Sequence, residues 1–243
     1  MTYCVGLRLN QGLVFMSDTR TNAGVDDISR VRKMHSWEVP GERVFTLLTA
    51  GNLATTQTVV AMIDERTKAP EDRSPSILDA PSMFQAANIV GSLLRDVVKN
   101  HGLSGPEATS KFGATLILGG QIKGSPPRLF LIYPEGNFIE AGDDNPFFQI
   151  GETKYGRPIL DRALKADMEF EEAVKLLCVS FDSTIRSNAG VDLPIDLQVQ
   201  NVDDCRISRQ RRFERGDPYF QKVSQGWSDA LSSAFAALPD FSF

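Results

Sequence analysis

The most constraining feature of the chain is a pair of apolar runs at its start, separated by a short polar turn. Apolar residues alternate through 3–9, and a second apolar run covers 13–16. Asn10-Gln11-Gly12 between them is typical of a hairpin turn, because asparagine and glycine adopt the backbone angles that tight turns need. Folding the chain about this turn places residues 18–20 opposite Thr2, so we expect Asp18 to lie beside the start of the chain.

Thr2 is a candidate nucleophile because it directly follows the initiator methionine. If Met1 is removed, one residue carries both a hydroxyl and a free α-amine. A hydroxyl alone is a poor nucleophile, and an amine that titrates near neutral pH can accept its proton. A small residue after a start codon is also common, so position alone favours the plainer interpretation.

A lysine follows in an alternating stretch, residues 31–37, which places Val31, Lys33, His35 and Trp37 on one face. Lys33 is either a surface side chain with a solvated ammonium or a buried ammonium paired with a carboxylate. Asp18 is correspondingly either a turn residue at a strand end or that carboxylate. Each residue taken by itself favours the surface alternative.

The combination resembles a known family. Its motifs, in order and at nearly the family's spacing, are Thr2, residues 17–20, Lys33 and residues 50–54, and they resemble the proteasome β-subunits, which are N-terminal nucleophile hydrolases. Asp182, Ser187 and Asn188 resemble a segment of the bacterial HslV-like peptidases. The length of the chain and its segment after residue 210 resemble the bacterial ancestral β-subunit group, Anbu, more closely. The resemblance covers essentially the whole sequence.

The resemblance implies roles for four residues. Thr2 would be the nucleophile, with its own amine as the base. Lys33 would pair with Asp18, and its charge would lower the proton affinity of the Thr2 amine and hydroxyl. The backbone N–H of Gly51 would stabilise the oxyanion of the tetrahedral intermediate. Gly51 also fits a plain structural role, because it ends an apolar run before a predicted helix.

The resemblance also implies a binding site for an extended peptide. Backbone around Thr21-Asn22-Ala23, and again around Gly51-Asn52-Leu53, would bind the peptide by strand addition. Arg20 would be a further substrate-binding residue. The side chains that would line its pocket are Val31, His35, Thr49 and Leu53. Asp182, Ser187 and Asn188 would support the site. No cofactor or metal is expected, because the two histidines and the carboxylates form no ligand motif.

Two departures from the family pattern affect the supporting residues. Where proteasome β-subunits have a Gly-Ser-Gly segment, this chain reads Gly151-Glu152-Thr153, and Thr184 stands near the position of a buried aspartate. We therefore expect a weak or selective threonine peptidase. A catalytically silent scaffold with the proteasome fold, and a hydrolase of a non-protein amide, are the alternatives.

The order of predicted elements indicates an α+β fold: a four-layer α-β-β-α sandwich in one domain, residues 1–243. Strands are expected near 3–9, 12–17, 32–38, 43–50, 112–121, 128–133, 137–140, 146–150, 195–201 and 204–210. Helices are expected near 52–68, 82–100, 153–166, 169–187 and 218–236. The helical segment after about 211 carries Tyr219, Phe220, Trp227, Leu231 and Phe235, for which we expect packing on the core rather than on a neighbour.

The composition limits the kinds of partner and the cellular compartment that we expect for the protein. A length of 243 residues with 42% hydrophobic residues is enough for one sizeable core, and a net charge of −5 argues against nucleic acid as the main partner. The basic run at 206–215 is expected at a solvated or subunit-facing edge. Three cysteines without metal or redox spacing, no signal peptide and no membrane-spanning stretch indicate a cytoplasmic protein with reduced thiols.

The partners that the resemblance implies are copies of the same chain and a peptide or protein substrate. Subunits of this family assemble into rings, and the Anbu group into closed or washer-like helical ones. Whether an ATP-driven unfoldase supplies the substrate is left open by the sequence.

Overall fold

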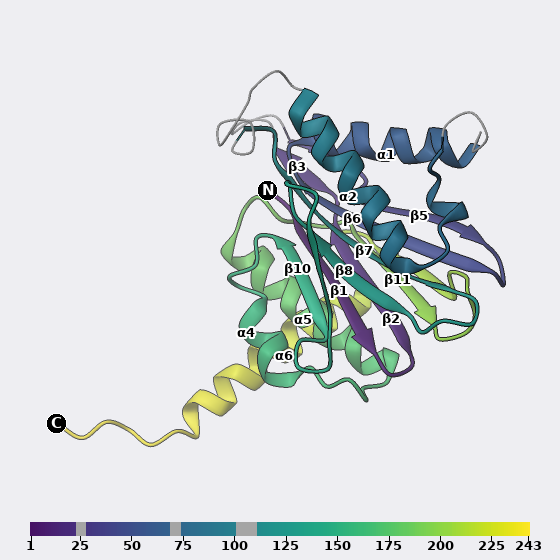
Figure 1. Ribbon diagram of the computed structural model, residues 1–243. Helices are drawn as coiled ribbons and strands as arrows, with labels where there is room; N and C mark the ends of the chain where they lie inside the picture. The colour runs from purple at the N-terminus through teal and green to yellow at the C-terminus, as the bar shows by residue number, and fades with distance from the viewer. Residues whose placement is uncertain (23–27, 69–73, 101–110) are drawn as a thin grey trace.

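The computed structural model describes residues 1–22, 28–68, 74–100 and 111–243 (Figure 1). Two five-stranded antiparallel sheets form its centre. The first has the order β10-β1-β2-β11-β12, and the second has the order β5-β6-β7-β8-β9. The strands of the first sheet are β1 (Tyr3–Leu9), β2 (Gly12–Asp18), β10 (Phe147–Gly151), β11 (Ile195–Asn201) and β12 (Arg209–Phe213). Those of the second are β5 (Met34–Val39), β6 (Arg43–Gly51), β7 (Ala114–Ile122), β8 (Arg128–Ile132) and β9 (Phe138–Glu140).

Helices cover the outer faces of both sheets (Figure 1). On one side lie α1 (Leu53–Lys68) and α2 (Met83–Asn100), with a short 3₁₀ turn, η1 (Ile77–Asp79), between them. On the other side lie α4 (Arg157–Ala163), α5 (Phe170–Ser187) and α6 (Pro218–Ala236). The predicted α-β-β-α sandwich is confirmed.

Three apolar layers hold the sandwich together, which explains why its strands are apolar on both faces. In β1, Tyr3 and Val5 point to the layer shared with α5. Cys4 points the other way, into the layer between the two sheets, where it joins Phe15 and Leu48. A third layer lies between the second sheet and helices α1 and α2. Because successive side chains of a strand alternate in direction, each inner strand contributes to two layers.

The first hairpin forms as predicted. Leu9 pairs with Gly12 and Cys4 with Ser17, so a two-residue loop, Asn10-Gln11, joins β1 to β2. Gly12 has a φ of 143°, and a Cβ there would lie 2.0 Å from the carbonyl oxygen of Gln200. This register brings Asp18 next to the start of the chain.

Several local features differ from the sequence predictions. The strand expected from residue 32 begins at Met34, and a small antiparallel pair, β3 (Arg20–Asn22) with β4 (Ile28–Arg30), was not predicted. The strand expected at 204–210 is β12, at Arg209–Phe213. The turn before it is longer than expected because the Asp204 carboxylate accepts hydrogen bonds from Asn201 Nδ2 (2.8 Å) and Ser208 Oγ (2.9 Å).

The basic run forms the edge strand β12 and the turn after it. Each of its arginines at 209, 211, 212 and 215 makes an ion pair within the chain, with Glu171, Asp217, Asp196 and Asp192 respectively. The run therefore lies at a sheet edge, as expected, with these charges compensated locally.

The prediction for α6 is wrong for its second half. Phe220 is buried and Val223 packs against the core beneath the first sheet. Leu231 and Phe235, however, are 50% and 78% exposed. The helix extends beyond the sheets that it was expected to cover (Figure 1), so its later turns have no core beneath them.

The cysteines Cys4, Cys178 and Cys205 are buried and unpaired. Within the described ranges, every helix is too short or too polar to cross a membrane.

Candidate active site

The start of the chain is fixed by strand β10. Tyr3 pairs with Gly151, and the backbone N–H of Glu152 donates to the carbonyl oxygen of Thr2 (2.6 Å). Gly151 has a φ of 85°, and a Cβ there would lie 2.0 Å from the same Thr2 oxygen. Only glycine allows this approach without displacing Thr2.

A buried ion pair lies directly beside Thr2. Lys33 Nζ donates to Asp18 Oδ1 at 2.8 Å, to the Arg20 carbonyl oxygen at 2.5 Å and to the Met1 carbonyl oxygen at 3.2 Å. These contacts use the three N–H groups of the ammonium. The Asp18 carboxylate also accepts from the backbone N–H groups of Tyr3 (2.9 Å) and Arg20 (3.2 Å). Of the two alternatives for Lys33, a solvated surface ammonium or a buried ammonium paired with a carboxylate, the structure therefore has the second.

Burial and charge act on this site together. Burial raises the pKa of Asp18, while Lys33 and the two backbone N–H groups act in the opposite direction and favour the carboxylate. Burial, and next the Lys33 charge, lower the pKa of the Met1 α-amine. Both effects disfavour the protonated form of the first amine of the chain.

Thr2 opens onto a small hollow between the chain start, β6 and the beginning of α1. The predicted residues that line it are Thr2, Thr21, Val31, Lys33, His35, Thr49, Gly51 and Leu53. The sequence interpretation did not include Arg32, Ala50, Thr56 and Gln57, which also line it. Thr56 and Gln57 follow Leu53 by three and four positions, so helical spacing could have identified them.

Two side chains of the hollow have a defined environment. The backbone N–H of Thr49 donates to the Lys33 carbonyl oxygen (3.0 Å), which fixes the lysine backbone against β6. His35 stacks on Trp37, with ring centroids 6.5 Å apart. Burial, and next the Arg32 charge, lower the pKa of His35, so the ring is neutral at neutral pH.

Gly51 ends β6 at the rim of this hollow. Its φ is 119°, and a Cβ there would lie 2.6 Å from the Gly113 carbonyl oxygen. The following residue, Asn52, accepts a hydrogen bond from the backbone N–H of Thr55 (3.1 Å) and so begins α1. The glycine thus stands where a strand turns into a helix whose first N–H groups have no partner within the helix.

Several predicted residues do not reach the hollow. The Arg20 side chain points to Asp192, at 3.0 Å. Asp182 lies on α5 and pairs with Arg186 at 2.9 Å, and Ser187 is exposed at the end of the same helix. Asn22 is described by its backbone alone, which belongs to β3, and Ala23 lies outside the described residues.

Asn188 is the one supporting residue that the structure brings to the chain start. Its Nδ2 donates to Glu152 Oε2 (2.9 Å) and lies 4.0 Å from the Met1 sulfur. The Met1 side chain rests against Gly190, where a Cβ would come within 2.5 Å of it. Glu152 was noted in the sequence only as a departure from the family pattern. The contact of the Glu152 backbone with Thr2 depends on the pairing of β10 with β1, which patterns in a single sequence do not predict.

Within the residues that the structure describes, no group of three or more histidine, cysteine, aspartate or glutamate side chains could hold a metal ion. The hollow and its surroundings present the threonine hydroxyl, the α-amine of the chain, a buried ammonium–carboxylate pair and backbone N–H groups.

Residues 2–193 match the sequence family described as proteasome subunit. The chain belongs to the proteasome subunit family. No curated protein matches the sequence.

Solved structures that resemble the chain carry the name Anbu. A Gly-1 mutant of Anbu from Hyphomicrobium sp. strain MC1 is 50% identical, with a TM-score of 0.92 over all of both chains. Anbu, the ancestral beta-subunit, from Yersinia bercovieri is 46% identical, with a TM-score of 0.92 over 99% of each chain. A helical assembly of the Anbu complex from Pseudomonas aeruginosa is 43% identical, with a TM-score of 0.91 over 99% of this chain and 98% of that one. The resemblance to Anbu found in the sequence is confirmed.

Proposed function

We propose that the protein is a threonine-type amide hydrolase whose nucleophile is Thr2 after removal of Met1. The observation that carries this proposal is the buried Lys33 ammonium, which contacts both Asp18 and the carbonyl oxygen of Met1 beside Thr2. A buried ion pair often stabilises a fold no more than apolar side chains of the same volume would, so its place beside a threonine supports a functional role. Membership of the proteasome subunit family supports the same chemistry.

The first step is acylation of Thr2. Its Oγ attacks the carbonyl carbon of the substrate amide, and the proton passes to the Thr2 α-amine. In the unprocessed chain, burial and next the Lys33 charge lower the pKa of the Met1 α-amine, and the Lys33 charge would act in the same direction on the Thr2 amine. The backbone N–H of Gly51 stabilises the oxyanion that forms.

The remaining steps of the reaction release the two products, the amine and the acid. The protonated α-amine gives its proton to the leaving nitrogen as the carbon–nitrogen bond breaks, which leaves an ester on Thr2. Water, deprotonated by the same amine, then attacks the ester carbonyl. The acid product leaves, and the Thr2 hydroxyl regains its proton.

The substrate in this proposal is an extended peptide that adds to the backbone at Thr21–Asn22 on one side and near Gly51 on the other. Its side chain would enter the hollow lined by Val31, His35, Thr49 and Leu53. Because the hollow is small and its lining includes Arg32 and Gln57 as well, the proposed enzyme is selective.

We further propose that copies of the chain assemble with one another in the cytoplasm, as the solved structure of a relative is described as a helical assembly. Assembly would enclose or align the hollows, and it does not depend on hydrolysis.

The hydrolysis proposal is tested with a library of fluorogenic peptide amides. The processed chain should release fluorophore from a subset of the library. Thr2→Ala and Lys33→Met should each lower the initial rate at least about 100-fold, the lower end expected for loss of a group that activates a nucleophile. Lys123→Met, a loss of the same charge at an exposed site, is the matched control and should keep the wild-type rate. Equal rates in wild type and Thr2→Ala would refute the proposal.

A further inference from the structure

The hollow beside Thr2 has an uncompensated positive charge in its wall, that of Arg32. Among the described residues that line the hollow, Arg32 and Lys33 carry a charge and none is acidic. Lys33 is balanced by Asp18, whose carboxylate lies 2.8 Å from its ammonium. The Arg32 side chain is exposed, and the ion pairs among the described residues do not include its guanidinium.

The charge of Arg32 acts inside the hollow, at the ring of His35. Burial lowers the pKa of His35 most, and the Arg32 charge lowers it next. The charge of Asp64 acts on that pKa in the opposite direction and more weakly. Asp64 is held outside the hollow by Trp37, whose indole N–H donates to its carboxylate at 2.7 Å. The two charges together therefore act on this wall as a positive one, although the chain as a whole carries −5.

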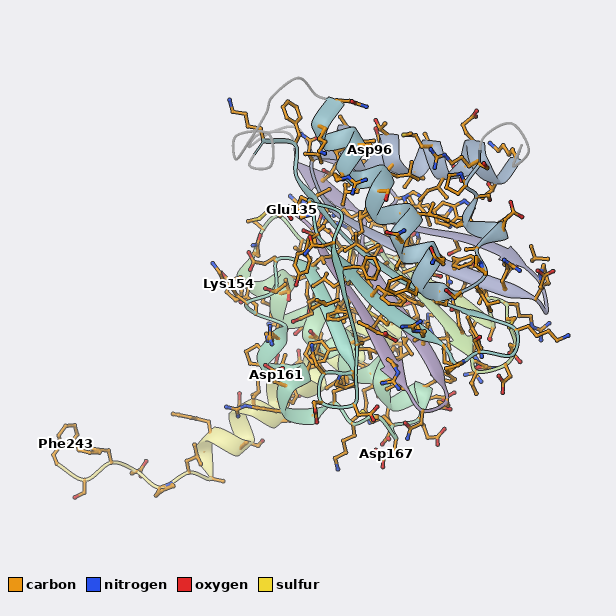
Figure 2. All side chains as sticks on the ribbon, viewed as in Figure 1. Asp96, Glu135, Lys154, Asp161, Asp167 and Phe243 are labelled. Carbon is orange, nitrogen blue, oxygen red and sulfur yellow. The ribbon has the colours of Figure 1, made fainter. Side chains whose placement is uncertain are left out.

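The carboxylate that shares a second hollow with Arg32 is already bound. This second hollow lies between β5 and the strands β11 and β12, and Asp196 and Arg212 also line it. Asp196 accepts two hydrogen bonds from Arg212, at 2.6 and 2.9 Å. Other acidic side chains lie far away: Figure 2 shows Asp167 at the lower edge of the molecule, whereas the chain start lies at the upper end of β1 (Figure 1). The Arg32 guanidinium is thus available to a bound anion.

The size and the polarity of the hollow beside Thr2 also suit a carboxylate. Its volume is about 30 Å³, and one water molecule needs at least about 10–15 Å³, so the hollow holds about two water-sized groups. A carboxylate has two oxygens, whereas an aromatic ring is larger than this space. The lining adds the hydroxyl of Thr21 and the exposed amide of Gln57 as neutral groups that can donate hydrogen bonds. A guanidinium binds a carboxylate through two parallel hydrogen bonds.

We propose that the hollow selects peptides with an acidic side chain, aspartate or glutamate, at the residue whose carbonyl carbon Thr2 attacks, and that Arg32 determines this selectivity. The inference rests on the proposed hydrolysis and names its substrate class. The acidic side chain enters the hollow and its carboxylate binds the Arg32 guanidinium, while the peptide backbone lies between Thr21 and Gly51. A neutral side chain of the same shape leaves the guanidinium without a partner and binds more weakly.

The first test compares peptide amides that differ only in the residue before a fluorogenic leaving group. The ratio of kcat/KM for aspartate over asparagine should be about 10 or more in the processed chain, the lower end for a hydrogen bond to a charged group. Arg32→Gln should bring this ratio close to one, and Arg32→Glu should make lysine the preferred residue. The matched control is Arg30→Gln, which removes the same charge from β4 outside the lining of the hollow and should keep the wild-type ratio.

The second test measures binding without hydrolysis. Thr2→Ala should bind a fluorescently labelled aspartate peptide about 10-fold more tightly than its asparagine counterpart, and adding Arg32→Gln should remove the difference. A wild-type chain that cleaves the asparagine peptide as fast as the aspartate peptide overturns this selectivity and leaves hydrolysis by Thr2 intact. A chain that cleaves no peptide refutes the hydrolysis instead, and the binding comparison then decides on Arg32. Equal affinities of Thr2→Ala for the two peptides overturn its role.

Discussion

Two carboxylates that the sequence interpretation placed in the site end in very different surroundings. Asp18 and Lys33 have side chains that are 0% and 6% exposed, and Asp18 accepts three hydrogen bonds. Asp182 is nearly as well shielded, but its partner Arg186 is 56% exposed and lies one helical turn away. The contrast supports the proposed role of the pair that is shielded on both sides, whereas a helix-surface pair can arise from local spacing alone.

The largest effect should come from Lys33→Met. This variant leaves the Asp18 carboxylate buried without its ammonium partner, and we expect the free energy of unfolding to fall by about 3–5 kcal/mol. Denaturant titration measures this loss. A fall below about 1 kcal/mol, the range of an exposed pair, would mean that Asp18 is not held as a buried carboxylate.

Adding Asp18→Asn to Lys33→Met should recover about 2 kcal/mol of that loss, because no uncompensated buried charge remains. The side-chain amide oxygen that this substitution introduces can still accept the Tyr3 N–H group. The double variant should nevertheless remain inactive. If it were less stable than Lys33→Met, the carboxylate would contribute through packing rather than through its charge.

Arg186→Ala should cost about 1 kcal/mol, well below Lys33→Met, because Arg186 is 56% exposed and water can replace it at the Asp182 carboxylate. The same denaturant titration provides the comparison with Lys33→Met, and Arg157→Ala, at an i, i+4 pair that is exposed on both sides, is the control. A loss as large as that of Lys33→Met would remove the contrast between the two pairs.

The smallest expected effect is a shift in the pH at which the Met1 α-amine titrates. Burial and Lys33 lower the pKa of the Met1 α-amine, so in the unprocessed chain this amine should become reactive at a lower pH than in an unfolded peptide. Lys33→Met should move the midpoint upward, because a like charge is removed. The pH dependence of acylation at the first residue, followed by peptide mass, measures the midpoint. An unchanged midpoint would show that Lys33 does not act on the amine.

The layers of the fold and the geometry of the first hairpin could be predicted because they follow from local signals. A two-residue turn fixes the register of β1 on β2, and that register alone brings Asp18 next to Tyr3. Alternating apolar residues then identify the strands whose faces fill the three apolar layers.

The parts of the fold and of the site that could not be predicted depend on contacts between segments that are distant in the sequence. The contact of Glu152 with Thr2 and Asn188 joins β10, the chain start and the end of α5, and no spacing in the sequence predicts it. The positions of Asp182 and Arg20 were also not predictable, because helix phase and a partner at Asp192 decide where these side chains point. The apolar face of α6 predicted core packing, which is correct for the first half of the helix and wrong for the second, because the pattern does not show where the body ends.

The decisive experiment for Thr2 as the nucleophile is the intact mass of the native protein before and after treatment with an epoxyketone, a reagent that needs a neighbouring hydroxyl and amine. We predict a chain that has lost one methionine and takes up one inhibitor at Thr2, with no uptake by Lys33→Met that has been processed to the same residue. A native chain that keeps Met1 and takes up no inhibitor would contradict this assignment.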